Sequence, residues 1–294
     1  MMPAVHTKDP SARRTPRRGP RRRLWLYAGA AVIVVWCLGP FYWMIVTAFR
    51  DAGHTFDPAP WPTHVTLDNF RAAFDTSGGD HFGRALLNSA IIASATTALA
   101  LLIGGPAAYA LVRLPMGGKT KVLAVVLCAS MFPGVAIVTP MFQLFTEIHW
   151  LGTFPALILP DLSFALPLTI WILTGFFAAM PWDLEKAAQT DGASPGQAFR
   201  LVLVPLAAPG LFTTAIMVFL SAWDEYLLAG LLSNGNPEVA PVTVAIANFA
   251  GSQPHQVPYT AIMAAGAIVT VPLMITVLVF QRRIVAGLTA GAFK

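Results

Sequence analysis

Residues 182–209, WDLEKAAQTDGASPGQAFRLVLVPLAAP, form a polar interruption between two long apolar segments. Their pattern predicts two short helices joined at a bend. We expect Asp183 to cap the first helix, because its carboxylate can accept a hydrogen bond from a backbone N–H that has no partner inside the helix. Asp191 and Gly192 should end that helix, since glycine readily adopts the positive φ of a tight turn.

The second helix has a start signal of its own. Ser194 is at the cap position, Pro195 at the first helical position and Gln197 at the third, which is the pattern of a capping box. Pro205 and Pro209 follow, and proline cannot donate the backbone hydrogen bond that a helix interior needs. We therefore expect the helix to kink or end there, before the next apolar segment begins.

The first short helix offers a surface of small residues. Leu184, Ala187 and Ala188 share one face at i, i+3 and i+4 spacing. Gly192 and Ala193 continue this surface into the bend, so another protein could approach the backbone closely. We call residues 184–194 the docking knob. An ordinary amphipathic loop between membrane helices would explain the caps but not this combination of residues.

The same stretch resembles the EAA loop of ABC-importer permeases, specifically the carbohydrate group of the maltose-permease G-subunit type. In that family the loop forms coupling helices, which insert into a cleft of a cytoplasmic ATPase subunit and convert its closure into movement of the membrane helices. The matching positions are Ala187, Ala188, Asp191, Gly192 and Pro205. The resemblance implies a type I ABC importer transmembrane domain, with Ala193 also among its coupling residues.

One position departs from the family pattern. The family usually has glutamate directly before the two alanines, whereas this chain has Lys186 there and Glu185 one residue earlier. We count both Glu185 and Lys186 among the ATPase-coupling residues. If the ATPase offers a basic partner to the usual glutamate, Lys186 puts that contact in doubt.

The amino-acid composition is typical of a membrane protein. Of its 294 residues 56% are hydrophobic and 11% charged, with a mean hydropathy of +0.64; soluble domains have about a quarter charged residues. Eight of the nineteen Lys and Arg residues precede the first apolar segment, which indicates membrane topology and contact with anionic lipid, not nucleic acid. Cys37 and Cys128 lie in apolar segments, without the neighbours of a metal site or a disulfide framework.

The apolar segments predict an all-α polytopic membrane protein with six transmembrane helices, since about 20 apolar residues cross a bilayer. The first helix should span residues 24–49, after a disordered basic tail at 1–23. An extracytoplasmic segment at 50–82 should carry a short surface helix within residues 66–74. The permease core should occupy 83–283 and a cytoplasmic tail 284–294. The five core segments are expected at 85–112, 121–146, 155–180, 210–232 and 259–281.

The basic residues predict the orientation. Placing both termini, the 113–121 loop and the 181–209 loop on one side collects sixteen Lys and Arg residues there and leaves Arg50, Arg71 and Arg84 on the other. By the positive-inside rule the sixteen face the cytoplasm. We therefore expect a multi-pass protein of the cytoplasmic membrane with both termini and the docking knob inside the cell.

Acidic residues inside the apolar segments are candidates for a substrate pathway, because each costs about 2.5–3.5 kcal/mol to insert and normally faces a cavity or a partner. Asp224 and Glu225, with Trp223 and Tyr226, form an aromatic and acidic group of the kind that binds sugars. The alternative is that they lie near the outer interface, satisfied by water. The family more often has asparagine at position 224, so Asp224 could instead pair with a partner permease.

Two further polar residues are weaker pathway candidates. Asn88 and Asp161 also lie in apolar segments, but packing and interhelical hydrogen bonds would account for both. Prolines and glycines cluster in the third and fourth segments, and such kinks suit helices around a cavity. The loop at 233–258 is turn-rich and poor in charge. The resemblance implies contact with a binding protein there, and an ordinary connecting loop fits equally well.

The sequence lacks a catalytic, metal or phosphate-binding constellation, including the Gly-x-x-x-x-Gly-Lys-Ser/Thr motif of P-loop ATPases. We therefore expect a non-catalytic subunit that binds no cofactor, with ATP and Mg on a partner ATPase. The resemblance implies further partners: a second homologous permease, a dimer of ABC ATPase subunits and an extracytoplasmic sugar-binding lipoprotein. No inverted repeat of a secondary transporter is evident.

The substrate prediction depends on finer resemblances. The docking knob, residues 241–249 and residues 280–294 look closest to permeases of actinobacterial and mycobacterial trehalose importers, and the family's C-terminal tail can reach the ATPase dimer. We therefore expect inward transport of a disaccharide such as trehalose by alternating access. Alternatives are maltose or maltodextrin as the sugar, a membrane receptor or scaffold without transport, and a secondary transporter driven by an ion gradient.

Overall fold

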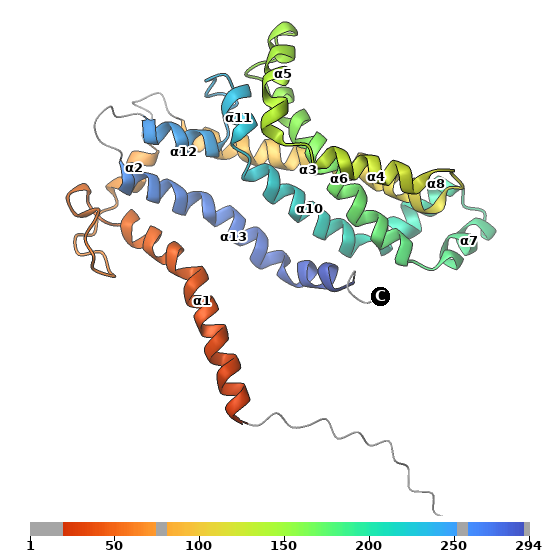
Figure 1. The fold of residues 1–294 in the computed structure, drawn as a ribbon, viewed down its shortest axis with the longest axis horizontal. Coiled ribbons are helices and arrows are strands. Elements are labelled where there is room, and N and C mark those ends of the chain that lie inside the picture. Colours follow the sequence, from red (N-terminus) through yellow and green to blue (C-terminus); the bar gives the residue numbers. More distant parts are fainter. Residues whose placement is uncertain (1–19, 75–80, 252–257, 291–294) are drawn as a thin grey trace, which may run out of the picture.

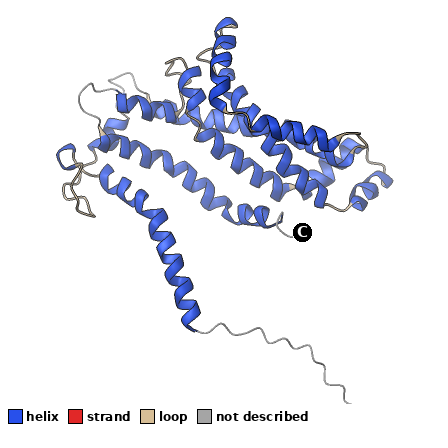
Figure 2. Ribbon diagram, in the orientation of Figure 1, coloured by secondary structure: helices blue, strands red, loops and turns tan. Residues whose placement is uncertain are grey.

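The computed structural model describes residues 20–74, 81–251 and 258–290. Within these ranges the secondary structure is helical, apart from one antiparallel bridge between Arg50 and Val65 (Figure 2). The helices are α1 (Pro20–Ala48), η1 (Ala52–His54), α2 (Asp68–Ala73), α3 (Phe82–Arg113), α4 (Lys119–Ser130), α5 (Gly134–Glu147), α6 (Phe154–Ala179), α7 (Trp182–Thr190), α8 (Pro195–Ala198), η2 (Phe199–Leu203), α9 (Val204–Leu206), α10 (Ala208–Trp223), α11 (Leu227–Leu232), α12 (Val242–Gly251) and α13 (Tyr259–Ala290).

Four described helices are long and apolar enough to cross a membrane, namely α1, α3, α6 and α13. Two bent pairs pass the same criterion: α4 with α5, at 84°, and Pro195–Leu206 with α10, at 75°. Counting each pair as one span gives up to six spans, the predicted number, although the second pair begins at Pro195, inside the predicted coupling loop. The predicted span at 121–146 is therefore broken, because Pro133 lacks the N–H to continue α4. The predicted span at 210–232 is interrupted after Trp223.

Three predicted boundaries differ from the structure. α1 begins at Pro20, before the expected start at residue 24, and residues 1–19 of the predicted tail lie outside the described residues. α13 continues to Ala290, so most of the predicted tail at 284–294 is helix. The predicted loop at 233–258 contains α12, whose first residue, Val242, is fully buried. Asn234 and Gly235, the turn residues of that predicted loop, do adopt positive φ.

The long helices lie side by side (Figure 1). α3 packs against α6 and α10, and α13 packs against α10 and α1. α7 and α8 lie at one end of this bundle, while α2 and α12 lie at the other (Figure 1). α1 diverges from the bundle along most of its length, and α5 projects from it (Figure 1).

Two glycines let helices approach closely. A Cβ atom on Gly104 of α3 would lie 2.5 Å from Thr169 Cγ2 of α6, and a Cβ atom on Gly210 of α10 would lie 2.5 Å from the Phe176 ring of α6. Both separations are far below van der Waals contact, so α3, α6 and α10 pack at distances that a larger residue would prevent.

The segment after α1 is folded onto the bundle end that carries α2. The short helix expected within residues 66–74 is present as α2. Its Asn69 side chain donates hydrogen bonds to the carbonyls of Ala48 and Arg50, at 2.8 and 2.6 Å. Near by, a hydrogen bond from the Ala59 backbone N–H lowers the pKa of Asp57 below its ordinary value.

Candidate functional site

The docking knob has the predicted helix–bend–helix shape, with one error at its start. α7 begins at Trp182 with Pro181 as its N-cap residue, and Asp183 makes no capping hydrogen bond. The extended Pro181, which cannot itself donate a hydrogen bond, sets the helix start earlier than Asp183. Asp183 therefore lies in the first turn, where its negative charge still favours the helix dipole. Gly192 has a φ of +91°, as the predicted bend requires.

The second predicted start is confirmed. The Gln197 backbone N–H donates to Ser194 Oγ at 3.3 Å, and the Ser194 N–H donates to Gln197 Oε1 at 2.8 Å, forming the capping box. The chain then passes through the π-helical η2 and bends before α10. Pro205 and Pro209 flank this bend, as expected.

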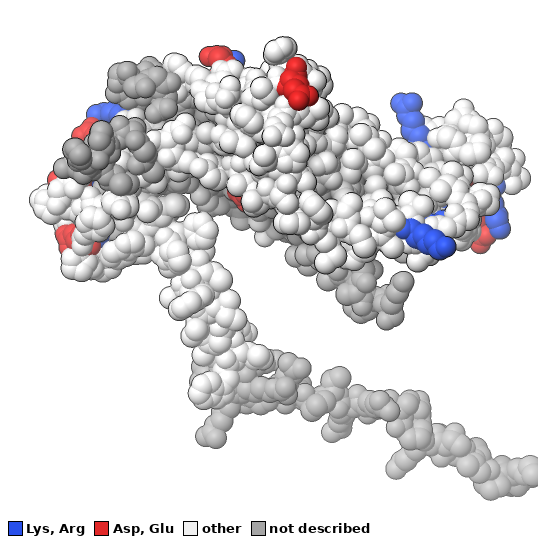
Figure 3. Space-filling model, turned by 45° about the horizontal axis from the view of Figure 1, so that its top comes forward, with Lys and Arg blue, Asp and Glu red and all other residues white. Residues whose placement is uncertain are grey.

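One side of the docking knob is exposed. Lys186, Ala187, Asp191 and Gly192 are exposed, while Ala188 and Ala193 are partly buried. Pro205, at the foot of α10, is also exposed. Lys and Arg side chains gather at this end of the molecule, whereas the charged side chains visible in the middle of the face are few and acidic (Figure 3). The exposed basic residues here are Lys121, Lys186 and Arg200.

Glu185 faces the opposite way and is only 7% exposed. The Tyr109 hydroxyl of α3 donates to its Oε1 at 2.6 Å, and Gln189 Nε2 donates to the same oxygen at 3.4 Å. Arg113 Nε lies 3.8 Å from its Oε2, an ion pair too long for a hydrogen bond. Glu185 therefore ties the docking knob to α3, and its carboxylate is not on the exposed surface.

Arg113 is the centre of this attachment. Its Nη2 donates to the carbonyls of Phe177 and Met180, at 3.2 and 2.8 Å, at the end of α6. Its guanidinium carbon lies 4.2 Å from the centroid of the Trp182 ring. The sequence interpretation did not identify Tyr109 and Arg113 as site residues. Their i, i+4 spacing at the end of an apolar segment is the signal that could have identified them.

The aromatic and acidic group predicted at 223–226 is not a single patch. Trp223 is 3% exposed and stacks on Phe219, with ring centroids 5.7 Å apart. Asp224 and Tyr226 are exposed and do not line the cavity to which Glu225 contributes. α10 ends at Trp223 and the chain turns, so consecutive side chains point in different directions. The prediction of a shared sugar-binding surface at these four residues is thus not supported by their placement.

Asn88 has a role in holding the loop before α12. It is fully buried, and its Nδ2 donates to the carbonyls of Ala240 and Pro237, at 3.0 and 3.5 Å. The Val242 N–H donates to Ser89 Oγ at 2.8 Å. These bonds fit the packing role weighed for Asn88, although they run from a helix to a loop and not between helices, and Asn88 is not among the residues that line the cavity.

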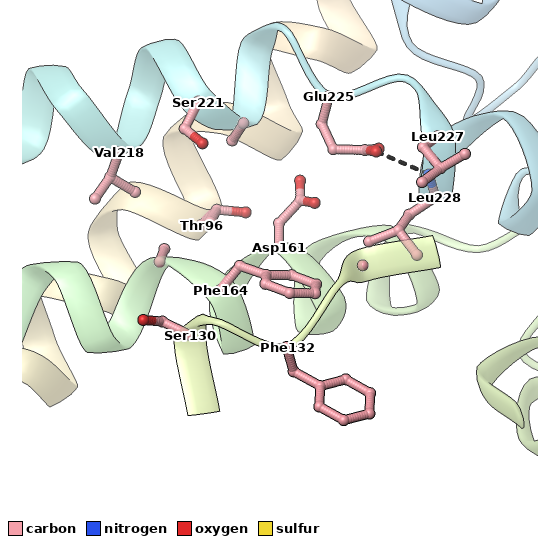
Figure 4. Close-up of a pocket in the computed structure, with 13 residues that line it drawn as sticks. Thr96, Ser130, Phe132, Asp161, Phe164, Val218, Ser221, Glu225, Leu227 and Leu228 are labelled. Atoms are coloured by element: carbon pink, nitrogen blue, oxygen red, sulfur yellow. Dashed lines mark hydrogen bonds between the residues drawn. The ribbon is translucent and has the colours of Figure 1, made fainter. Parts of the chain in front are cut away.

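Glu225 lines a partly open cavity between α3, α6 and α10 (Figure 4). Its two carboxylate oxygens accept hydrogen bonds from the N–H groups of Leu228 and Ala229, each at 2.8 Å. Asp161 of α6 lines the same cavity, and its carboxylate points toward that of Glu225 (Figure 4). The structure thus brings together Glu225 and the weaker candidate Asp161, which are distant in sequence.

Comparison with known proteins identifies the family. A profile of the binding-protein-dependent transport system inner membrane component family matches residues 118–289. The trehalose transport system permease protein SugB of Mycobacterium tuberculosis is 45% identical, over 94% of this chain and 99% of that protein. The trehalose/maltose transport system permease protein MalG of Thermococcus litoralis is 40% identical, over 93% and 97%.

The fold has a solved counterpart. A crystal structure of a bacterial ABC transporter that imports the acidic polysaccharide alginate contains a chain that aligns with a TM-score of 0.75, at 18% identity, over 91% of this chain and 99% of that one. The low identity makes this a likeness of fold, and it agrees with the predicted importer transmembrane domain. The chain belongs to the binding-protein-dependent transport system inner membrane component family, as a multi-pass permease subunit of the sugar-importing ABC type.

Proposed function

We propose that this chain is one of two permease subunits that together move a disaccharide into the cell, with trehalose as the first candidate and maltose or maltodextrin as the second. The identity to the mycobacterial trehalose permease, over almost the whole of both chains, supports trehalose. The Thermococcus litoralis relative, named for both trehalose and maltose, supports this pair of candidates.

The docking knob couples this movement to a cytoplasmic ATPase. One observation carries the proposal: α7 exposes small residues on one side while Glu185 holds its other side to Tyr109 and Arg113 of α3. A helix bound in this way transmits a push to the bundle instead of rotating freely. Lys186 occupies the exposed position where relatives usually have glutamate, so the ATPase surface facing it carries an acidic or neutral group.

The remaining partners follow from the same assignment. A second permease completes the pathway, and an extracytoplasmic binding protein delivers the sugar; a solved structure of the alginate importer contains a periplasmic protein with bound pentasaccharide. ATP and Mg belong to an ATPase dimer, because this sequence has no P-loop. Both termini and the docking knob face the cytoplasm, which the exposed basic residues at that end support.

Uptake by the assembled complex tests the proposal. Proteoliposomes that contain both permeases, the ATPase and the binding protein would receive labelled trehalose or maltose, with ATP inside. Gly192→Pro replaces a residue at φ +91° and removes its N–H, which donates to Gln189 O at 3.1 Å. The matched control is Gly118→Pro, because Gly118 also has positive φ, at +79°, but lies outside the docking knob.

We expect ATP-dependent uptake by the wild type, at least a tenfold loss in Gly192→Pro and a smaller loss in Gly118→Pro. The ATPase should also co-purify less with Gly192→Pro. Uptake that ran without ATP on an ion gradient would instead indicate a secondary transporter. The absence of uptake of either sugar, with a stable complex, would favour a receptor or scaffold.

A further inference from the structure

A cavity lies where three helices and two chain breaks meet. Its volume is about 400 Å³, and it lies between α3, α6 and α10, next to the break between α4 and α5 and the break between α10 and α11. The polar side chains that line it are Thr96, Ser130, Asp161, Ser221 and Glu225. Cavities that bind small molecules are usually about 300–1,000 Å³ in volume. This cavity is therefore large enough for an organic ligand.

Asp161 is a buried carboxylate without a partner in the described part of the chain. It is 9% exposed, and among the groups that the structure describes none donates a hydrogen bond to its carboxyl group. Its carboxylate points into the cavity (Figure 4). An unpaired carboxylate at membrane depth is costly and normally faces a partner or a pathway. Asp161 is therefore positioned to accept hydrogen bonds from a molecule that enters the cavity.

Thr96 of α3 is a second buried polar side chain that lines the cavity without a hydrogen-bond partner among the described residues. It is fully buried, and its Oγ1 has no hydrogen-bond partner in the described structure. Threonine hydroxyls in helices usually donate to the carbonyl four residues earlier, as Thr97 does to Ala93 O at 2.6 Å. Thr96 does not, and its hydroxyl is directed toward Asp161 and the cavity (Figure 4). The pocket thus holds two unsatisfied polar groups from two different helices.

Glu225 adds a fixed acceptor on the opposite wall. The N–H groups of Leu228 and Ala229 each bond one of its oxygens and hold the carboxylate in place. Each oxygen retains a further lone pair for another donor. The residues that line the cavity include no Lys, Arg or His to neutralise Glu225 or Asp161. The cavity is therefore lined by two acidic side chains without a cationic partner among its lining residues, and it has an excess of hydrogen-bond acceptors.

These groups fit a neutral, hydroxyl-rich molecule. Sugar hydroxyls would donate to Asp161 and Glu225 and exchange hydrogen bonds with Thr96 and Ser221, which can both donate and accept. The Phe164 ring lies beside Asp161 and offers an apolar face to the C–H surface of a sugar (Figure 4). A bare cation is a poorer fit, because metal ligands must converge to about 2–2.6 Å and this cavity is far wider. An anionic sugar would be disfavoured, because its carboxylate would meet an acidic lining whose described residues include no cation to pair with it.

We propose that the cavity lined by Thr96, Asp161, Ser221 and Glu225 is a sugar-contacting site that admits neutral disaccharides and rejects sugars that carry a carboxylate. This inference rests on the proposed function and assigns the substrate class to specific side chains of this subunit. It makes Asp161 and Glu225 selectivity residues, with Thr96 as a further contact.

Uptake kinetics in the same proteoliposomes test the site. Labelled trehalose is the probe, and an unlabelled disaccharide that contains a uronic acid is the competitor. The variants are Asp161→Asn, Thr96→Val and the double variant Asp161→Asn with Glu225→Gln. Glu147→Gln is the matched control, because Glu147 is an exposed carboxylate at the end of α5, outside the cavity.

We expect KM for trehalose to rise about tenfold or more in Asp161→Asn and less in Thr96→Val, as for the loss of a charged and a neutral hydrogen bond. Glu147→Gln should match the wild type. The uronic disaccharide should not inhibit wild-type uptake but should inhibit the double variant. Misfolding cannot produce this gained inhibition, so it separates recognition from stability.

Two results would overturn the site. An unchanged KM in both Asp161→Asn and Thr96→Val, together with normal ATP-driven uptake, would reject the cavity and leave the proposed importer function intact. Loss of the partner permease from purified Asp161→Asn complexes, with an unchanged KM in the remainder, would assign the cavity to the subunit interface. Failure of the wild type to take up either neutral disaccharide would instead reject the proposed function.

Discussion

Glu185 and Asp161 are both buried acidic residues, but they differ in how many partners the chain provides for them. Glu185 is 7% exposed; its Oε1 accepts hydrogen bonds from Tyr109 and Gln189, and its Oε2 has, within the described residues, only the longer ion pair with Arg113. Asp161 is 9% exposed, and its carboxyl group accepts no hydrogen bond from the groups that the structure describes. A buried charge that the chain pairs with its own side chains holds the structure together. A buried charge that the chain leaves unsatisfied is available to a ligand, and this difference separates the coupling end from the cavity.

The largest expected effect is that of Arg113→Met, which removes the cation beside Glu185. Breaking a buried ion pair by removing one partner costs about 3–5 kcal/mol, because the other charge remains buried. The carbonyls of Phe177 and Met180 would lose their donor as well. Thermal unfolding of the purified complex in detergent should show a clearly lowered midpoint, with reduced ATPase co-purification. A midpoint equal to that of the wild type would show that the contact between Arg113 and Glu185 does not stabilise the fold.

Tyr109→Phe should have the next largest effect. It removes only the hydroxyl that donates to Glu185 at 2.6 Å. Hydrogen bonds to charged groups contribute about 1.5–3 kcal/mol, so the midpoint should fall by less than in Arg113→Met. Because both residues act on one carboxylate, the double variant should lose less than the two single losses added together. Additive losses would show that Tyr109 and Arg113 act independently.

Asp161→Asn should change stability in the opposite direction. The amide is cheaper to bury than the carboxylate, and no partner is lost, so we expect equal stability or a gain of up to about 1 kcal/mol. The same variant should transport trehalose less well, which would show that Asp161 is kept for function. A stability loss as large as that of Arg113→Met would mean that Asp161 has a structural partner.

Arg84→Gln should have the smallest effect. Arg84 pairs with Glu238 at 2.9 Å, but both side chains are about half exposed. Exposed ion pairs contribute about 0–1 kcal/mol because water and salt screen them. The unfolding midpoint should therefore change little, and Arg84→Gln serves as the baseline for the buried ion pair. A loss of several kcal/mol here would show that charge pairing stabilises this protein regardless of burial.

Local signals in the sequence predicted local structure well. Ser194, Pro195 and Gln197 determined a helix start through contacts three residues apart, and Gly192 determined the bend. Asp183 was misassigned because a cap depends on the conformation of the preceding residue, here Pro181, as well as on side-chain chemistry. α12 was missed because its flanking turn residues dominated the composition of that segment.

The pairing of distant residues could not be read from one sequence. Tyr109 and Glu185 are separated by 76 positions, and their contact depends on how α3 and α7 are oriented. Thr96 and Asp161 meet only because α3 and α6 pack side by side. Conversely, Trp223, Asp224, Glu225 and Tyr226 are adjacent in sequence but point apart, since α10 ends between them. The family of the chain was therefore more predictable than the composition of its cavity.

The close packing at Gly104 and Gly210 has a mechanical consequence. Neither site has room for a methyl group, so α6 cannot move independently toward α3 or α10. α3, α6 and α10 would therefore move together as one rigid body when a force acts on the docking knob. The helices beside the cavity are interrupted at residues 131–133 and 224–226. Bending of the chain would then occur at these two breaks. Force applied at one end of the molecule would thus act on the two places where the helices are interrupted.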